Sequence, residues 1–260
     1  MSLRRSPLFP VAGVTLALLL AFASLAVVPE VHAQLFSYGR VAQQRAGELS
    51  IIWQAVDFQP DTNRPTEGAP MFTGPAYGIM YARANISATL TYGSESSTAG
   101  HNSRLLDVAV ATWSSLFTIG ASETSRLYLP LTLQTNYRRV APKGQANSPF
   151  GSFQVTVIGL GVGLGGSTER GKNVRLEARA APALGIALRS FGGSTGMAWL
   201  VDAGARMHIR EVFKRFGLSA GYGFRTQSWR VGEANLILEP SETRLDYLGS
   251  QHMITLGLNW

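Results

Sequence analysis

Apolar and polar residues alternate along most of the chain. In the stretch 216–224 every second residue is apolar, and the residues between them are glycine or serine. A period of two places successive side chains on opposite faces of a β-strand. Nine segments of this kind follow residue 48, most of them separated by Gly, Ser, Asn or Pro. They cover residues 49–58, 79–92, 105–117, 126–140, 153–164, 174–188, 197–209, 216–229 and 247–260.

The last predicted strand has a distinctive end. In the decapeptide QHMITLGLNW, an apolar row alternates with polar or small residues, and the chain ends on its aromatic member. The row consists of Ile254, Leu256, Leu258 and Trp260. It resembles the carboxyl-terminal signal by which Gram-negative outer-membrane β-barrel proteins are recognised and inserted. This resemblance implies that the row is an assembly signal and that the barrel assembly machinery is a partner during insertion.

The amino terminus has the composition of an export signal. Arg4 and Arg5 precede an apolar run over 11–28, and Val31-His32-Ala33 matches a small-residue cleavage site. We expect residues 1–33 to be a cleaved signal peptide. A retained membrane anchor is the alternative, because 18 residues reach the lower limit for spanning. Residues 34–47 then form a short periplasmic segment, and residues 48–260 form the barrel.

A closed barrel is the architecture that these features favour. No segment after the leader is long and apolar enough for a membrane helix, and a membrane protein without such helices must bond its backbone between strands. A soluble lipocalin-like barrel or a β-sandwich would show the same alternation. The leader, the terminal strand and aromatics near strand ends (Tyr92, Tyr137, Trp229, Trp260) favour the bacterial outer membrane. The pattern resembles the small outer-membrane barrels of the OmpA/OmpX class. The absence of cysteine excludes a disulfide framework.

The nine predicted strands do not fit the strand count of a bacterial barrel. Nine is odd, and bacterial single-chain barrels have an even number. The segment 49–58 is the weakest candidate, because Ile51 and Ile52 interrupt its alternation and Asp57 follows on the apolar face. We therefore predict an all-β, antiparallel, up-and-down transmembrane barrel of eight strands, with ten as the alternative. With Trp260 in the periplasm, 93–103, 141–151, 190–195 and 229–245 become extracellular loops.

The chain is basic, with a formal net charge of +7, and arginine supplies most of the positive charge. No basic helix or nucleic-acid module accompanies it, so a nucleic-acid partner is not expected. Arginines on the outside match lipopolysaccharide phosphates, although ordinary solvated charge is the simpler interpretation. The expected partners are outer-membrane lipids and lipopolysaccharide. The oligomeric state is not predicted.

Nine charged residues fall on the polar, inward face of the predicted strands. They are Arg83, Asp107, Arg138, Arg175, Glu177, Arg179, Asp202, Arg206 and Arg225. In a narrow barrel such side chains fill the interior, and unpaired charges there are costly. We expect a salt-bridged network that largely occludes the lumen. The alternative is a narrow anion-preferring pore for small solutes, lined with arginine.

Catalytic chemistry has little support. His101-Asn102-Ser103 resembles the His-x-Ser element of outer-membrane lipid A deacylases, but Arg104 replaces the asparagine that follows it in that family. The glycines of 159–166 lack the Lys-Ser/Thr of a phosphate loop, and no metal-ligand spacing is found. We predict a structural or binding barrel with no enzymatic activity, catalytic residues, cofactor or metal. An outer-membrane lipid hydrolase is the remaining alternative.

Overall fold

The computed structural model describes residues 47–61, 70–83, 85–94, 103–142, 152–171, 173–189, 195–213, 215–232 and 244–260. All regular structure in these ranges is β-strand, and none of it is a helix able to cross a membrane. The strands are β1 (Gly47–Pro60), β2 (Phe72–Arg83), β3 (Ile86–Gly93), β4 (Ser103–Ala121), β5 (Ser125–Pro142), β6 (Phe153–Val162), β7 (Leu164–Arg170), β8 (Val174–Arg189), β9 (Gly196–Phe213), β10 (Phe216–Gly232) and β11 (Arg244–Asn259).

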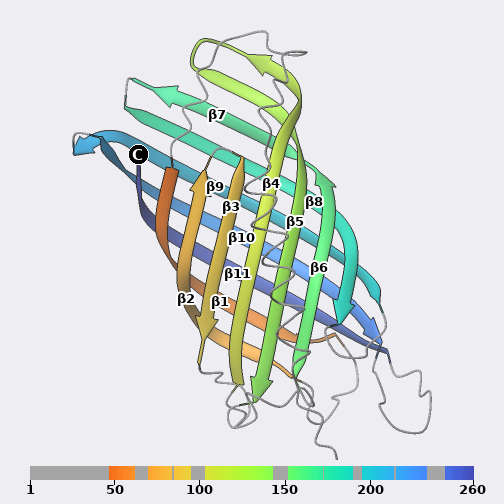
Figure 1. Cartoon of the computed structure of the whole chain (residues 1–260). Coiled ribbons are helices and arrows are strands. Elements are labelled where there is room, and N and C mark those ends of the chain that lie inside the picture. The colour runs from red at the N-terminus through yellow and green to blue at the C-terminus, as the bar shows by residue number, and fades with distance from the viewer. Residues whose placement is uncertain are drawn as a thin grey trace, which may run out of the picture. The chain divides into compact units, whose positions relative to one another are not determined.

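The strands form one closed antiparallel barrel (Figure 1). Each strand pairs with its neighbours in the sequence, and β11 returns to pair with β1. β6 and β7 occupy a single position between β5 and β8, separated only by Gly163. Eleven strand segments therefore make a wall of ten strands.

The ten-stranded alternative is correct, and the favoured count of eight is wrong. The predicted strand 79–92 is a hairpin in which β2 ends at Arg83 and β3 begins at Ile86, with Asn85 in the turn. The weak candidate 49–58 is a full wall strand, β1, paired on both sides. Its alternation is interrupted because Ile51 faces outward while Ile52 is packed inside. An apolar residue on the inner face is therefore compatible with this wall.

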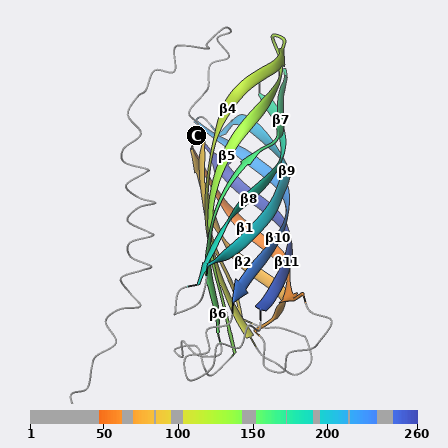
Figure 2. The same cartoon turned by 90° about the vertical axis from the view of Figure 1, so that its right-hand side faces the viewer.

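The two rims of the barrel differ. At one rim the first residue of β1 meets the last residue of the chain, with hydrogen bonds from Gly47 N to Trp260 O (2.9 Å) and from Trp260 N to Gly47 O (3.0 Å). We call this the terminal rim. Its connections are short, at 84–85, 122–124, 171–173 and 214–215, whereas 61–71, 94–102, 143–152, 190–195 and 233–243 join strands at the opposite loop rim. Figure 2 shows the β4–β5 hairpin extending farthest at the terminal rim.

Large apolar side chains cover the outer wall. Residues of the assembly-signal row are 46–56% exposed, and Ile51, Ile79, Leu160 and Leu184 show similar or larger exposure. Apolar cover of this extent on every side is unsuited to water and matches the lipid-facing belt of a transmembrane barrel. The fold is therefore an antiparallel, up-and-down transmembrane β-barrel.

Candidate functional site: the lumen

The structure places most of the predicted lumen residues on the inner wall. Arg83 is the exception, because it is exposed on the outer wall at the end of β2. The outward residues of β2 are odd-numbered, as Ile79 and Tyr81 show, whereas those of β3 are even-numbered, as Leu90 and Tyr92 show. The sequence prediction counted β2 and β3 as one strand, and it therefore placed Arg83 on the inner face instead of the outer face.

A buried polar cluster lies toward the loop rim. Arg138, which is 1% exposed, donates from Nε to Oδ2 of Asp107 (3.0 Å), and its Nη2 also bonds that carboxylate. The same Nη2 donates to Gln251 Oε1 at 2.5 Å, and Asn136 donates to the other carboxylate oxygen of Asp107. The opposite charges of Arg138 and Asp107 are matched here, as a buried ion pair requires, and Asn136 Oδ1 is left without a hydrogen-bond partner among the described residues.

An aromatic plug packs against this cluster. It consists of Phe58, Phe153, Trp229 and Tyr247, whose ring centroids lie 4.6–5.8 Å apart. The Arg138 guanidinium lies over the rings of Phe58 (5.6 Å) and Trp229 (5.0 Å). Trp229 was expected at a membrane interface, but it is fully buried inside. We call the plug and the Arg138 cluster together the sealed half of the lumen.

Asp202 and Arg225 form the next pair toward the terminal rim. Arg225 donates to Asp202 Oδ2 from Nε (3.0 Å) and from Nη2 (2.5 Å), a forked geometry. The two side chains are 19% and 13% exposed, more than those of Asp107 and Arg138. Solvent exposure of the ion pairs thus rises away from the plug.

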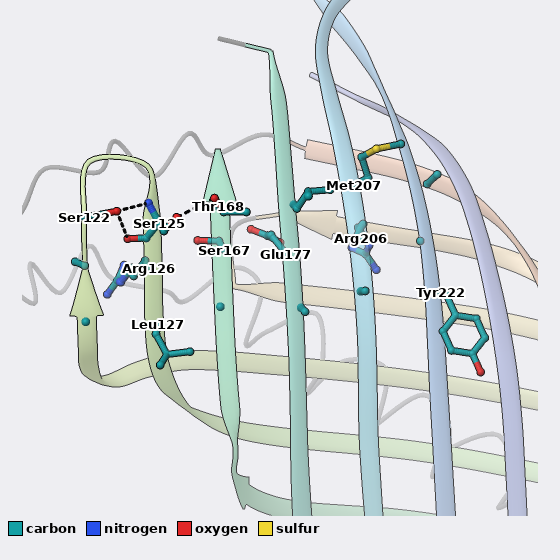
Figure 3. Close-up of a pocket in the computed structure, with 18 residues that line it drawn as sticks. Ser122, Ser125, Arg126, Leu127, Ser167, Thr168, Glu177, Arg206, Met207 and Tyr222 are labelled. Carbon is teal, nitrogen blue, oxygen red and sulfur yellow. Dashed lines mark hydrogen bonds between the residues drawn. The ribbon is translucent and has the colours of Figure 1, made fainter. Parts of the chain in front are cut away.

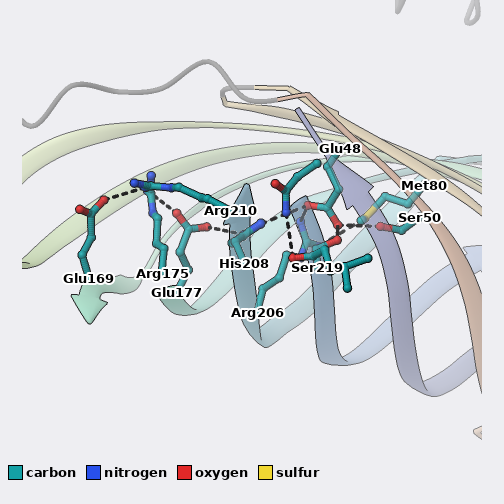
Figure 4. Close-up of polar contacts among 12 residues, drawn as sticks. Glu48, Ser50, Met80, Glu169, Arg175, Glu177, Arg206, His208, Arg210 and Ser219 are labelled. Atoms are coloured by element: carbon teal, nitrogen blue, oxygen red, sulfur yellow. Dashed lines mark hydrogen bonds and ion pairs between the residues drawn. The ribbon is translucent and has the colours of Figure 1, made fainter. Parts of the chain in front are cut away.

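The remaining inner wall, toward the terminal rim, carries a chain of charged contacts that we call the open half (Figure 4). Glu48 accepts hydrogen bonds from Ser50 (2.6 Å), Ser219 (2.9 Å) and Arg206 (3.2 Å). His208 lies between two carboxylates, 3.9 Å from Glu48 and 3.8 Å from Glu177. These contacts link β1, β8, β9 and β10 across the wall.

Two further ion pairs complete the open half. Arg175 contacts Glu177, and Arg210 donates to Glu169 Oε1 at 2.7 Å. The predicted site did not include Glu48, Glu169, His208 or Arg210. Glu48 and Arg210 lie just beyond the predicted strand ends, and Glu169 lies in β7, for which no separate strand was predicted. A longer extension of the alternating pattern would have found these three, whereas His208 lies inside the predicted strand 197–209 and shares the polar face of Asp202 and Arg206.

The outer wall has a shallow depression of about 970 Å³ near the terminal rim (Figure 3). Leu127, Gly166, Ala178, Ala205 and Tyr222 stand opposite one another on successive strands β5, β7, β8, β9 and β10. Three small residues between two large ones leave the hollow. Leu127 and Tyr222 are exposed, so the depression belongs to the lipid-facing surface and not to the lumen.

The candidate hydrolase element is only partly visible. His101 and Asn102 lie outside the described residues, and Ser103 is buried at the start of β4. The lipid hydrolase alternative therefore stays a prediction. No group of metal-ligating side chains occurs within the described ranges.

Comparison with known proteins yields structural similarity only. No family model matches the chain, and no curated protein does. Neisserial surface protein A is 12% identical, with a TM-score of 0.29, covering 82% of this chain and 97% of its own. The translocator domain of the autotransporter NalP from Neisseria meningitidis is 12% identical, with a TM-score of 0.32, covering 97% and 98%. The Ralstonia pickettii toluene transporter TbuX is 9% identical, with a TM-score of 0.24, covering 82% and 88%.

The structure of the barrel wall itself indicates to which class of protein the chain belongs. All backbone edges of the paired strands close into one ring, and the outward side chains form an apolar cover. Closed barrels are the β-structures that span a membrane, and in bacteria such barrels are outer-membrane proteins. The chain is an outer-membrane β-barrel protein.

Proposed function

We propose that the protein is a structural or binding barrel whose lumen does not conduct. The main support for this proposal is the aromatic plug. Phe58 and Trp229 are 0% exposed, and Phe153 and Tyr247 are 3% exposed. Rings in mutual contact leave no room for water between them, and a dry apolar constriction is a barrier to ions.

The Arg138 cluster supports the same proposal. Its guanidinium is held by Asp107 and Gln251 and stacked on two plug rings, so it connects the wall to the plug. Moving the plug aside would expose or unpair this buried charge, which is costly. A fixed closure is therefore favoured over a readily opened one.

We also propose how the barrel lies in the membrane. Short turns face the periplasm in bacterial barrels and longer loops face outward, so the terminal rim is periplasmic. The outward row Ile254, Leu256, Leu258 and Trp260 ends at that rim, which supports its role as the assembly signal. The lipid-facing wall supports outer-membrane lipids as its neighbours, and lipopolysaccharide remains part of this proposal.

An anion-preferring pore is the second candidate. It is favoured by an excess of arginine over carboxylate in the open half, where Arg179 contacts Trp113 and Arg126 contacts Ser115 and Thr118. Positive charge along a path selects anions only when the path is continuous. The plug argues against continuity, so we place this function second.

Planar-bilayer recordings test the proposal. We expect no stable single-channel steps from the wild type. Phe153→Ala removes one ring from the plug and should raise ion flux, whereas Leu160→Ala on the outer face of the same strand should not. Heat-modifiable migration checks that each variant is folded. Stable, anion-selective steps from the wild type would establish the pore instead.

A further inference from the structure

Most charges of the open half are paired, but two arginines are not. Each carboxylate there has its own arginine, as the list of pairs shows: Glu48–Arg206, Glu177–Arg175 and Glu169–Arg210. Within the described part of the chain, Arg126 and Arg179 have no carboxylate at ion-pair distance. A guanidinium stays charged at any physiological pH. The open half therefore carries two positive charges with no carboxylate of the described residues in ion-pair contact, and the carboxylates of Asp202 and Glu177 act on Arg179 at longer range.

Arg179 is held by stacking. Its guanidinium carbon lies 4.0 Å from the centroid of the Trp113 ring. Arg179 is on β8 and Trp113 on β4, with β5 and the β6/β7 position between them in the wall, so the side chain reaches across the lumen. Stacking occupies the face of the guanidinium and leaves its N–H donors in the plane of the group. Those donors remain available to a ligand.

Tyr128 connects the two arginines. Its ring lies over Gly165, where an added Cβ would come within 2.6 Å of the ring. In the sheet register, Gly165 stands between Tyr128 and Arg179. On the other side, the Arg126 guanidinium lies 5.6 Å from the centroid of the same ring. The glycine thus allows Tyr128 to extend over β7 toward Arg179, and the Tyr128 hydroxyl is then influenced by the charges of Arg179, Arg126 and the Glu177 carboxylate.

Arg126 is positioned without being neutralised. Its Nε and Nη2 donate to Thr118 Oγ1 at 3.3 and 3.0 Å, and Nη2 also donates to Ser115 Oγ at 3.2 Å. Hydroxyl acceptors orient the guanidinium but carry no charge. Arg126, Tyr128 and Arg179 are each partly exposed, in contrast to Arg138. The group is therefore accessible from the terminal rim.

We propose that Arg126, Tyr128 and Arg179 form a binding site for a soluble phosphate-bearing anion. The planar donors of Arg179 match two phosphate oxygens, Arg126 supplies a second charge, and the Tyr128 hydroxyl donates a further bond. Phosphate suits the arrangement better than a carboxylate, because its oxygens surround one centre and are reached from several sides. A lipid headgroup is excluded from the assignment, since lipid tails cover the outer wall while these side chains face the lumen. The site needs access from the terminal rim only, so it does not depend on conduction.

Calorimetric titration with inorganic phosphate tests the site on full-length mature protein refolded in neutral-detergent micelles. We expect saturable binding at one site. Arg179→Gln should weaken it by roughly ten- to hundredfold, the usual cost of a hydrogen bond to a charged group. Arg83→Gln removes the same charge from the outer wall and should leave the affinity unchanged. Arg179→Lys, which keeps the charge but loses the fork, should fall between the wild type and Arg179→Gln.

Tryptophan fluorescence gives a second measurement. Phosphate bound at Arg179 should change the emission of the wild type, and Trp113→Phe should abolish that change. Heat-modifiable migration confirms the fold of each variant. The proposal is overturned if the folded wild type binds no phosphate, if Arg179→Gln binds as tightly as the wild type, or if Arg83→Gln weakens binding equally.

Discussion

The two halves of the lumen use the same ion pairs in different surroundings. In the sealed half, Arg138 and Asp107 have side chains only 2% and 4% exposed, and the Arg138 guanidinium lies over the rings of Phe58 and Trp229. In the open half, Arg175 and Glu177 are 25% and 35% exposed. An arginine–carboxylate pair is expensive to break when it is buried and worth little when water can replace either partner.

This difference assigns separate roles to the two halves. The sealed half combines a buried ion pair with packed rings, which suits a permanent closure. The open half contains more exposed ion pairs, such as Arg175–Glu177, and, on our proposal, two arginines ready for an anion. A barrel of uniform interior would provide neither a firm closure nor an accessible site.

The largest expected effect comes from unpairing the sealed half. Asp107→Leu leaves Arg138 buried without its carboxylate and removes the acceptor of Asn136. We expect the free energy of unfolding to fall by about 3–5 kcal/mol, the usual penalty for an uncompensated buried charge. Urea unfolding of the refolded barrel in micelles measures this loss.

The double variant Asp107→Leu/Arg138→Met supplies the control. Replacing a buried pair by apolar residues is often neutral, so most of the lost stability should return. If the double variant is as unstable as Asp107→Leu alone, shape and packing at position 107 matter more than charge, and the contrast between the halves has been misassigned.

Much of the inner wall could be predicted from alternation alone. On β8, Arg175, Glu177 and Arg179 alternate with outward residues such as Leu176, and the structure places all three inside. The period of a strand fixes the face of each side chain without reference to its partners. The barrel class and the inner face were therefore accessible from local sequence.

The strand count depended on a subtler local signal. The apolar row has odd numbers at Ile79 and Tyr81 and even numbers at Leu90 and Tyr92. Such a change of phase indicates a turn, here between the end of β2 at Arg83 and the start of β3 at Ile86. Because this turn was missed, nine candidates were counted, and leaving out the weak candidate 49–58 to reach an even number gave the prediction of eight strands.

The partners inside the barrel were not predictable in the same way. Glu48 meets Arg206 from strands far apart in the sequence, and that contact depends on how the closed wall brings β1 near β9. The plug was also not predicted. Alternation shows on which face of the wall a side chain lies, but it does not show whether the inward side chains are polar or apolar at a given height in the barrel. Phe58 and Trp229 occupy inward positions where the general pattern predicts polar residues.

A smaller effect is expected at the boundary of the open half. Glu48 has a 5% exposed side chain, but its partner Arg206 is 24% exposed. Arg206→Gln removes one charged hydrogen bond while Ser50 and Ser219 continue to donate. We expect a loss of about 1.5 kcal/mol in urea unfolding. Arg206→Lys should recover part of the lost stability. If Arg206→Gln instead costs as much stability as Asp107→Leu, the ion pairs of the open half are as shielded from water as those of the sealed half, and the contrast between the halves is wrong.

The smallest effect is expected for Glu177→Gln. Its carboxylate contacts Arg175 and His208 in a hydrated part of the wall, where exposed ion pairs contribute at most about 1 kcal/mol. Unfolding at low salt should show a loss below that value, and 1 M salt should remove the difference, because the screening length there is only about 3 Å. Glu169→Gln, in the equally exposed pair with Arg210, is the matched comparison. A salt-independent loss of several times this size would mean that water does not reach Glu177, and the open half would then lack the accessibility that anion binding requires.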